Sequence, residues 1–321
     1  MMMELTEGRV NFTFVLLTFL IYSFSTSTSA QTGTDFKTIL YHENDSSSYE
    51  LDYFRSQKNL QQREPLMIFV HGGGFSGGTR AHGHPFCKFL ADSGINAATI
   101  SYPLYMKGKN FSCDGIQQEK IKAIHLGAHF ARLATAYFIQ HADSLNIDTT
   151  KVFLAGSSAG AESVLQAAYW DTTAENFYPD TLPEKFKYAG VISGAGAIID
   201  INMISESSKI PTLCYHGTCD PLVPYNIAPH HYCDPTKTGY MMLFGSLAIH
   251  KKLKEIGGHT HLMTYCGDGH KHAGTAFYGK EMYTVLDFTN RVIDKEKFTI
   301  HRIFEGTDSC NNGLEFEFCS Y

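Results

Sequence analysis

The sequence lacks the features that mark several protein classes. It has no run of lysine or arginine, and its formal net charge is only −6, so neither nucleic acid nor an acidic membrane surface is an expected partner. No cysteines form a C-x-x-C pair, and no histidines and carboxylates stand at metal-ligand spacing, which disfavours a metal site. Two histidine pairs, His230 with His231 and His259 with His261, could suggest a metal site. Adjacent residues are poorly placed to share one metal ion, so the expectation does not change. Internal repeats and low-complexity linkers are also absent, which favours a single folded domain.

The chain also has no apolar run of the ~20 residues that a membrane-spanning helix needs. Its N-terminus instead has the order of a secretory signal: Arg9, then the apolar stretch Val10–Phe24, then the small residues Ser25–Ala30. We therefore expect residues 1–30 to be a signal peptide that is cleaved after Ala30, although a membrane anchor is the alternative. The mature protein, residues 31–321, is expected to be one secreted or periplasmic domain with no stable membrane span.

Eight cysteines fit export, because an even number in an exported chain predicts disulfides. Cys310 and Cys319 are close enough in sequence to pin the C-terminal tail, residues 295–321. Cys87 and Cys113 are a second candidate pair. The other four cysteines can pair in more than one way, so their connectivity stays open.

The stretch on which the other motifs depend is Gly156-Ser157-Ser158-Ala159-Gly160. An apolar run, Val152–Ala155, precedes it and predicts a buried strand, and a helix-forming run follows from Ala161. A G-x-S-x-G motif between a strand and a helix is the setting of a nucleophile elbow. The flanking glycines carry no Cβ that would clash in so sharp a turn. We therefore predict that Ser158 is exposed at the end of the strand as a candidate nucleophile.

A second motif, His71-Gly72-Gly73-Gly74, follows directly on the apolar run Pro65–Val70. Consecutive glycines allow backbone N–H groups to point into a cavity that side chains would otherwise fill. Such donors can stabilise the oxyanion of an acyl-transfer intermediate. The motif therefore predicts an oxyanion-binding loop next to Ser158.

Strands and helices alternate from residue 65 to residue 293, which predicts an α/β fold with a mostly parallel sheet and helices on both faces. Before them, 36–41 and 49–55 are expected to form an antiparallel hairpin. The buried strands are expected at 65–70, 95–102, 152–155, 188–193, 211–216 and 261–266. The helices are expected at 85–93, 117–146, 161–170, 245–256 and 280–293.

Three stretches resemble the α/β-hydrolase superfamily, and within it the hormone-sensitive-lipase-like and carboxylesterase-like serine esterases. They are residues 71–75, 145–160 and 216–224, and the resemblance spans most of the mature chain. It implies the α/β-hydrolase fold, a Ser-Asp-His triad in that chain order, and no cofactor. It also implies an oxyanion hole formed by the N–H groups of Gly73, Gly74 and Ala159.

The resemblance also selects the acid and the base. Asp220 matches the family's acid in its "HG…D…VP" pattern, and Asp200 is the runner-up. His270 matches the histidine of a Gly-x-Gly-His loop after the last strand, and His272 competes with it. The added loop 225–240 lies between acid and base, so the substrate mouth is expected to differ there.

Two further polar residues stand near these motifs. His71 is expected to hold the glycine loop by a hydrogen bond rather than to take part in chemistry. Glu162 lies four residues after Ser158, so it can face the active site, but an exposed or capping glutamate is the simpler interpretation.

These features together predict an exported serine esterase that acts through an acyl-enzyme on a small-molecule or polysaccharide-linked ester. A carbohydrate esterase that removes acetyl or feruloyl groups is the alternative within enzymes. A non-catalytic homologue used for binding is the alternative outside them. The oligomeric state stays open.

Overall fold

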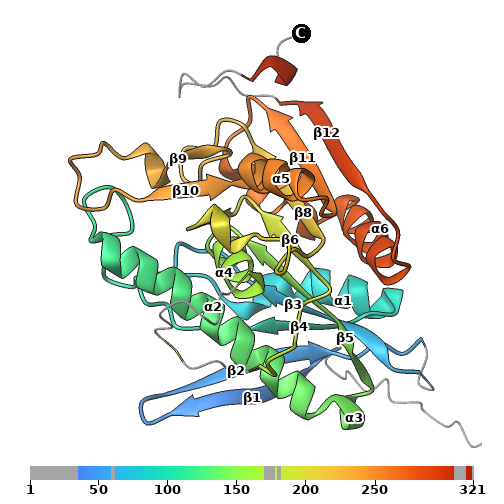
Figure 1. Cartoon of the computed structure of the whole chain (residues 1–321). Coiled ribbons are helices and arrows are strands. Elements are labelled where there is room, and N and C mark those ends of the chain that lie inside the picture. The colour runs from blue at the N-terminus through green and yellow to red at the C-terminus, as the bar shows by residue number, and fades with distance from the viewer. Residues whose placement is uncertain (1–34, 59–61, 170–177, 179–181, 307–315, 320–321) are drawn as a thin grey trace, which may run out of the picture. The chain divides into compact units, whose positions relative to one another are not determined.

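The computed structural model describes residues 35–58, 62–169, 178, 182–306 and 316–319, and residues 35–321 form one compact unit. Within the described residues, nine strands form the main sheet in the order β1-β2-β4-β3-β5-β6-β8-β11-β12 (Figure 1). In this order the seven strands from β4 to β12 are parallel to one another, whereas β1 and β2 form an antiparallel hairpin whose strand β2 pairs antiparallel with β4. The predicted fold, a mostly parallel sheet with an N-terminal antiparallel hairpin, is confirmed.

The strands of the main sheet are β1 (Lys37–Asn44), β2 (Ser47–Phe54), β3 (Glu64–Val70), β4 (Asn96–Ile100), β5 (Ile147–Ser157), β6 (Gly190–Gly194), β8 (Thr212–Gly217), β11 (Thr260–Cys266) and β12 (Thr299–Glu305). A small antiparallel sheet lies beside it, formed by β7 (Ala197–Ile198), β10 (Met242–Gly245) and β9 (Ile227–Pro229). The α-helices are α1 (His84–Ser93), α2 (Gln117–Gln140), α3 (Ala142–Leu145), α4 (Ala159–Ala168), α5 (Ser246–Glu255) and α6 (Glu281–Ile293).

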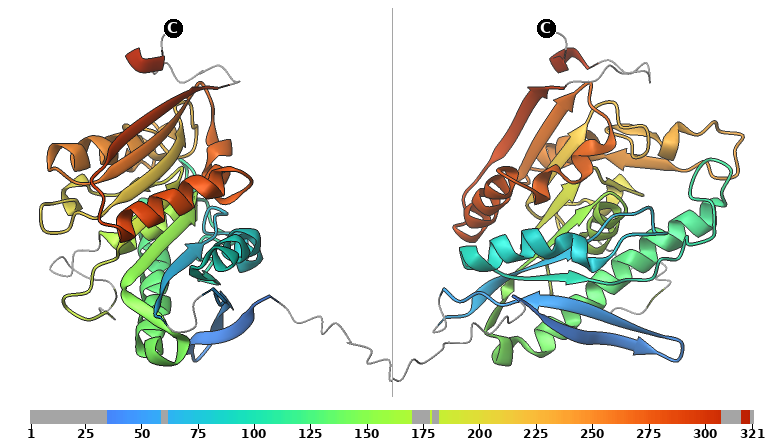
Figure 2. Two further views of the ribbon diagram at one scale, coloured as in Figure 1. Left: turned by 90° about the vertical axis from the view of Figure 1, so that its right-hand side faces the viewer. Right: turned by 180° about the vertical axis from the view of Figure 1, so that it is seen from behind.

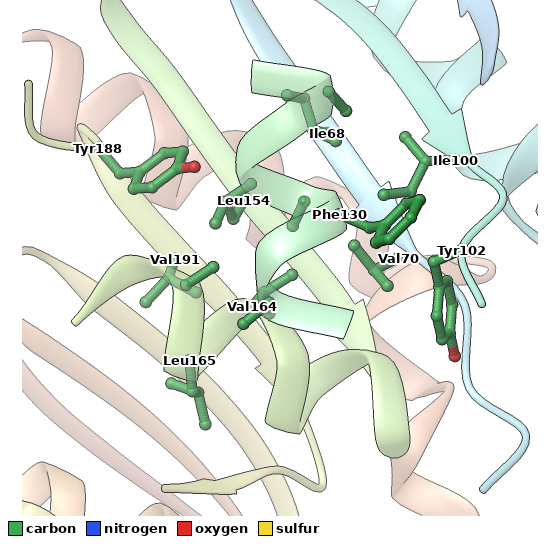
Figure 3. Packing of buried hydrophobic residues seen from close by; sticks show 14 of the residues in the cluster. Ile68, Val70, Ile100, Tyr102, Phe130, Leu154, Val164, Leu165, Tyr188 and Val191 are labelled. Atoms are coloured by element: carbon green, nitrogen blue, oxygen red, sulfur yellow. The ribbon is translucent and has the colours of Figure 1, made fainter. Parts of the chain in front are cut away.

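Helices cover both faces of the main sheet, as Figure 2 shows from two further sides. Helices α2, α4 and α5 contribute to the first of two large core clusters, and α1 and α6 contribute to the second. Figure 3 shows side chains of β3, β5 and β6, such as Ile68, Leu154 and Val191, packed against Phe130 of α2 and Val164 of α4. The two largest core clusters among the described residues pack on this sheet and position the strand ends, where the candidate site residues lie.

Two parts of the secondary structure differ from the prediction. The tail contains β12, which pairs parallel with β11 at the edge of the sheet. Its residues are half-buried or exposed, so it has no continuous apolar run by which to recognise it. The added loop 225–240 contains β9, and β10 follows directly after it.

The disulfides differ from both candidate pairs. Cys113 pairs with Cys233, and Cys266 pairs with Cys319. Both predicted pairs are therefore wrong, since Cys113 and Cys319 are each bonded elsewhere, and Cys87 is a free buried thiol on α1. The reason is geometric, because a disulfide depends on which strand ends and loops meet in space rather than on sequence distance.

The predicted signal peptide lies outside the described residues. Over the residues that the structure does describe, no helix is both long and apolar enough to cross a membrane.

Candidate active site

Ser158 lies at the turn between β5 and α4, as the G-x-S-x-G motif predicts. Its backbone has φ 53° and ψ −121°, a region that non-glycine residues rarely occupy and that costs on the order of 1–3 kcal/mol. The turn also requires Gly160, because a Cβ there would collide with the backbone carbonyl of Val70 on β3. The strained turn holds the Ser158 hydroxyl out at the carboxyl end of the sheet.

The glycine loop follows β3 and lies against the elbow. Gly73 has φ 122°, and a side chain there would collide with the backbone of Gly77. His71 donates from Nδ1 to the Gly72 carbonyl at 2.7 Å, as expected for a residue that holds the loop. Tyr102 adds a second anchor, since its hydroxyl donates to the His71 carbonyl at 2.8 Å. The loop is therefore fixed from both sides before any ligand arrives.

Three predicted residues come together in a chain of hydrogen bonds. The Oγ of Ser158 lies 2.8 Å from Nε2 of His270, and Nδ1 of His270 lies 2.6 Å from Oδ2 of Asp220. The three residues follow β5, β8 and β11, whose carboxyl ends meet at one edge of the sheet. The geometry is that of a nucleophile, a base and a carboxylate that orients the base.

Asp220 is fully buried and accepts several hydrogen bonds. The backbone N–H groups of Leu222 and Val223 donate to its Oδ1 at 2.9 and 3.0 Å, and Nε2 of His216 lies 3.3 Å from its Oδ2. Burial alone would raise the pKa of Asp220, but the hydrogen bonds from His216 and His270 outweigh it and hold the pKa well below its usual range. The carboxylate is therefore ionised at neutral pH and can stabilise a cationic His270.

The alternative acid and base lie elsewhere. His272 contacts Asp268 through Nε2 at 2.7 Å and Thr275 through Nδ1 at 3.0 Å, so both of its ring nitrogens are occupied away from Ser158. Asp200 accepts from the backbone N–H of Asn202 at 2.9 Å in a local turn. His272 therefore forms an Asp–His pair of its own with Asp268, whereas His270, paired with Asp220, is the histidine that contacts Ser158.

Ser158 borders two cavities. The larger, of about 470 Å³, is also lined by Gly73, Gly74 and His270. The smaller, of about 190 Å³, is lined by Gly74, Ala159 and the side chains discussed below. The three predicted oxyanion-hole residues therefore lie around Ser158, with Gly74 shared by both cavities. Within the described ranges, no three His, Cys, Asp or Glu side chains gather as a metal site would require.

The structure corrects the interpretation of Glu162 as an exposed or capping residue. Its side chain is 1% exposed and lies 3.7 Å from Nε2 of His230, which is equally buried. The helix α4 starts at Ala159, so position 162 turns toward the smaller cavity and away from solvent. Burial raises the pKa of Glu162 to about 8, although Lys120 acts to lower it.

His230 is a site residue that the sequence did not reveal. It comes from the added loop 225–240, which the disulfide Cys113–Cys233 ties to the segment before α2. Lys120 on α2 is fully buried and donates from Nζ to the Gly239 carbonyl at 2.8 Å, which fixes the same loop. The one feature of the sequence that points to His230 is the added loop that contains it, because this loop is expected to alter the substrate mouth.

Replacing Glu162 with glutamine should stabilise the protein at pH 8 but much less at pH 5. With a folded pKa of about 8 against 4.5, the carboxyl ionises first in the unfolded chain, so stability falls as pH rises from about 4.5 to 8. Glutamine does not titrate and escapes this loss. We expect the gain to grow by on the order of 2 kcal/mol between pH 5 and pH 8. Urea unfolding of both proteins at the two pH values measures it, and a pH-independent difference would contradict the buried neutral carboxyl.

A family model described as BD-FAE matches residues 51–209, just under half of the 321-residue chain. A curated relative, Esterase B1 of Culex pipiens, is 27% identical over 130 residues. That match covers 40% of this chain and 24% of the relative, so the chain spans about a quarter of the relative's length. The segment that the BD-FAE model matches, residues 51–209, includes β3, the glycine loop and the elbow.

Solved structures of esterase 2 from Thermogutta terrifontis share the fold. The native form is 16% identical with a TM-score of 0.55, and the match covers 81% of this chain and 91% of that one. The propionate-bound form gives the same identity and TM-score, over 81% and 93% of the two chains. The form phosphorylated by paraoxon is 17% identical over the same shares, with a TM-score of 0.54. The chain therefore shares the fold of these esterase structures, and its glycine loop and elbow lie within the segment that the family model matches.

Proposed function

We propose that the protein is a serine hydrolase of carboxylic esters that acts through Ser158, His270 and Asp220. The observation that carries the proposal is the hydrogen-bond chain from Ser158 Oγ through both ring nitrogens of His270 to the buried carboxylate of Asp220. The strained backbone of Ser158 supports the same role, because strain of this kind is typical of functional sites.

The proposed reaction has two steps. His270 takes the Ser158 proton at Nε2 while Oγ attacks the ester carbonyl, and the backbone N–H groups of Gly73, Gly74 and Ala159 bind the oxyanion. His270 then gives the proton to the leaving alcohol, which yields an acyl-enzyme. In the second step His270 deprotonates a water molecule that attacks the acyl carbonyl, and the acid leaves as Ser158 regains its proton.

Export of the mature protein is part of the proposal. It rests on the signal-like order of residues 1–30 and on the disulfides Cys113–Cys233 and Cys266–Cys319, which are typical of oxidising compartments. Small-molecule and polysaccharide-linked esters are the proposed substrates.

The nucleophile can be identified by covalent labelling with a fluorophosphonate, in which a serine oxygen displaces fluoride from phosphorus. We expect one label per chain, located at Ser158 by peptide mapping, with parallel loss of 4-nitrophenyl butanoate hydrolysis. The neighbouring Ser157 provides the matched control: Ser157→Ala should still be labelled, and Ser158→Ala should not. A label on another residue, or equal labelling of both variants, would reject the assignment. A panel with methyl ferulate and acetylated xylan then tests the carbohydrate-esterase alternative.

A further inference from the structure

The smaller cavity beside Ser158 contains two buried polar side chains with unused hydrogen-bonding atoms. Glu162 and His230 both line it, and each is about 1% exposed. Among the residues that the structure describes, Oε1 of Glu162 and Nδ1 of His230 have no hydrogen-bond partner. The 3.7 Å between Glu162 Oε1 and His230 Nε2 is too long for a hydrogen bond between them.

Unpaired buried polar atoms are costly, at about 1–3 kcal/mol each, and so are uncommon in folded proteins. Here the two residues that carry them line one cavity, which Ser158 also lines. A bound polar group that reaches both atoms would remove this cost. The presence of two such residues around one cavity therefore favours a ligand that carries a hydrogen-bonding group.

The charges around the cavity favour a neutral group. Burial raises the pKa of Glu162 to about 8 and lowers that of His230 well below its usual value, so both side chains are uncharged at neutral pH. The buried Lys120 lies close enough to influence both groups, and its charge disfavours an ammonium ligand. A hydroxyl is neutral and can both donate and accept, so it matches a protonated carboxyl and a neutral imidazole.

The position of His270 tells which half of the ester enters this cavity. His270 must reach the leaving alcohol to protonate it, and His270 lines the larger cavity and not the smaller one. The alcohol therefore leaves through the larger cavity, and the acyl chain enters the smaller one. A volume of about 190 Å³ is below the range of ordinary ligand pockets, so the acyl chain must be short.

We propose that the smaller cavity is an acyl subsite selective for short acyl chains that carry a hydroxyl group, which Glu162 and His230 bind. The proposal rests on the proposed esterase function. It assigns specificity to a residue of the elbow helix, Glu162, and to a residue of the added loop, His230. The Cys113–Cys233 disulfide and the bond from Lys120 to Gly239 hold that loop in place, so the subsite is built before the substrate arrives.

The test compares 4-nitrophenyl 3-hydroxybutanoate with 4-nitrophenyl butanoate, which share the leaving group and differ in one acyl hydroxyl. We expect the wild type to prefer the hydroxylated ester by about 10-fold or more in kcat/KM, since one buried hydrogen bond is worth about that much. Glu162→Met should reduce this ratio to about 1. Glu162→Gln should retain most of it, because an amide also donates and accepts.

The matched control is Gln166→Met. Gln166 lies one turn further along α4, is also buried, and does not line the cavity, so this variant should keep the wild-type ratio. A wild-type ratio near 1 with good butanoate turnover would overturn the subsite and leave the proposed function standing. An equal fall of the ratio in Glu162→Met and Gln166→Met would also overturn it.

A binding measurement keeps the subsite testable without turnover. Calorimetric titration of the wild type with 3-hydroxybutanoate and with butanoate should show tighter binding of the hydroxy acid, by about the same factor. Preserved discrimination in binding with no hydrolysis of either ester would reject the proposed function alone. Equal affinity for the two acids would reject the subsite.

Discussion

Replacing His270 with alanine should lower kcat/KM for 4-nitrophenyl butanoate by about 10⁴-fold, whereas His272→Ala should change it by only a few-fold. Removal of the base leaves Ser158 as an unactivated alcohol, and losses of this size are typical when a member of such a triad is removed. His270 lies 2.8 Å from the Ser158 hydroxyl, while both ring nitrogens of His272 are occupied by Asp268 and Thr275.

The two variants serve as controls for each other because both remove a histidine from the same loop. His272 is the more buried and stacks on Tyr265 with ring centroids 3.6 Å apart, so His272→Ala should be the less stable protein. Melting temperatures recorded beside the kinetics separate this loss of stability from loss of the base. A larger kinetic defect in folded His272→Ala than in His270→Ala would reverse the assignment.

The sequence predicted those parts of the site that depend on local chain geometry. The elbow needs glycine at 156 and 160, and the glycine loop needs residues that tolerate positive φ. Both motifs can therefore be recognised from the amino-acid sequence alone. The buried strands before Ser158 and His71 are continuous apolar runs, because both of their faces are covered. These features place each motif at the end of a strand without knowledge of the tertiary structure.

The parts that the sequence did not predict depend on contacts between distant segments. Glu162 is buried because the added loop brings His230 over the elbow helix, and no local pattern encodes that contact. The Cys266–Cys319 pairing likewise depends on where the tail passes the end of β11. The edge strand β12 is half-exposed. Apolar and polar residues therefore do not alternate along it clearly enough to distinguish it from a loop.

The second large effect is expected for Asp220→Asn, which should lower kcat by about 10³–10⁴-fold with little change in KM. An ionised Asp220 accepts a hydrogen bond from the Nδ1–H of His270 at 2.6 Å, which leaves Nε2 free to take the Ser158 proton. An asparagine amide can donate at the same place and so favours the opposite tautomer, in which Nε2 carries the proton and cannot act as base. The loss falls on kcat because the cationic histidine forms only during the reaction.

Asp268→Asn is the matched control for this prediction. Asp268 is almost as buried as Asp220 and holds His272 at 2.7 Å, so the same substitution alters a similar Asp–His pair that does not reach Ser158. We expect it to retain kcat within a few-fold, as measured on folded protein with 4-nitrophenyl butanoate. Comparable losses in the two variants would mean that burial of a carboxylate beside a histidine, rather than its connection to Ser158, determines activity. A loss confined to Asp220→Asn assigns the effect to the tautomer of the one histidine that contacts the nucleophile.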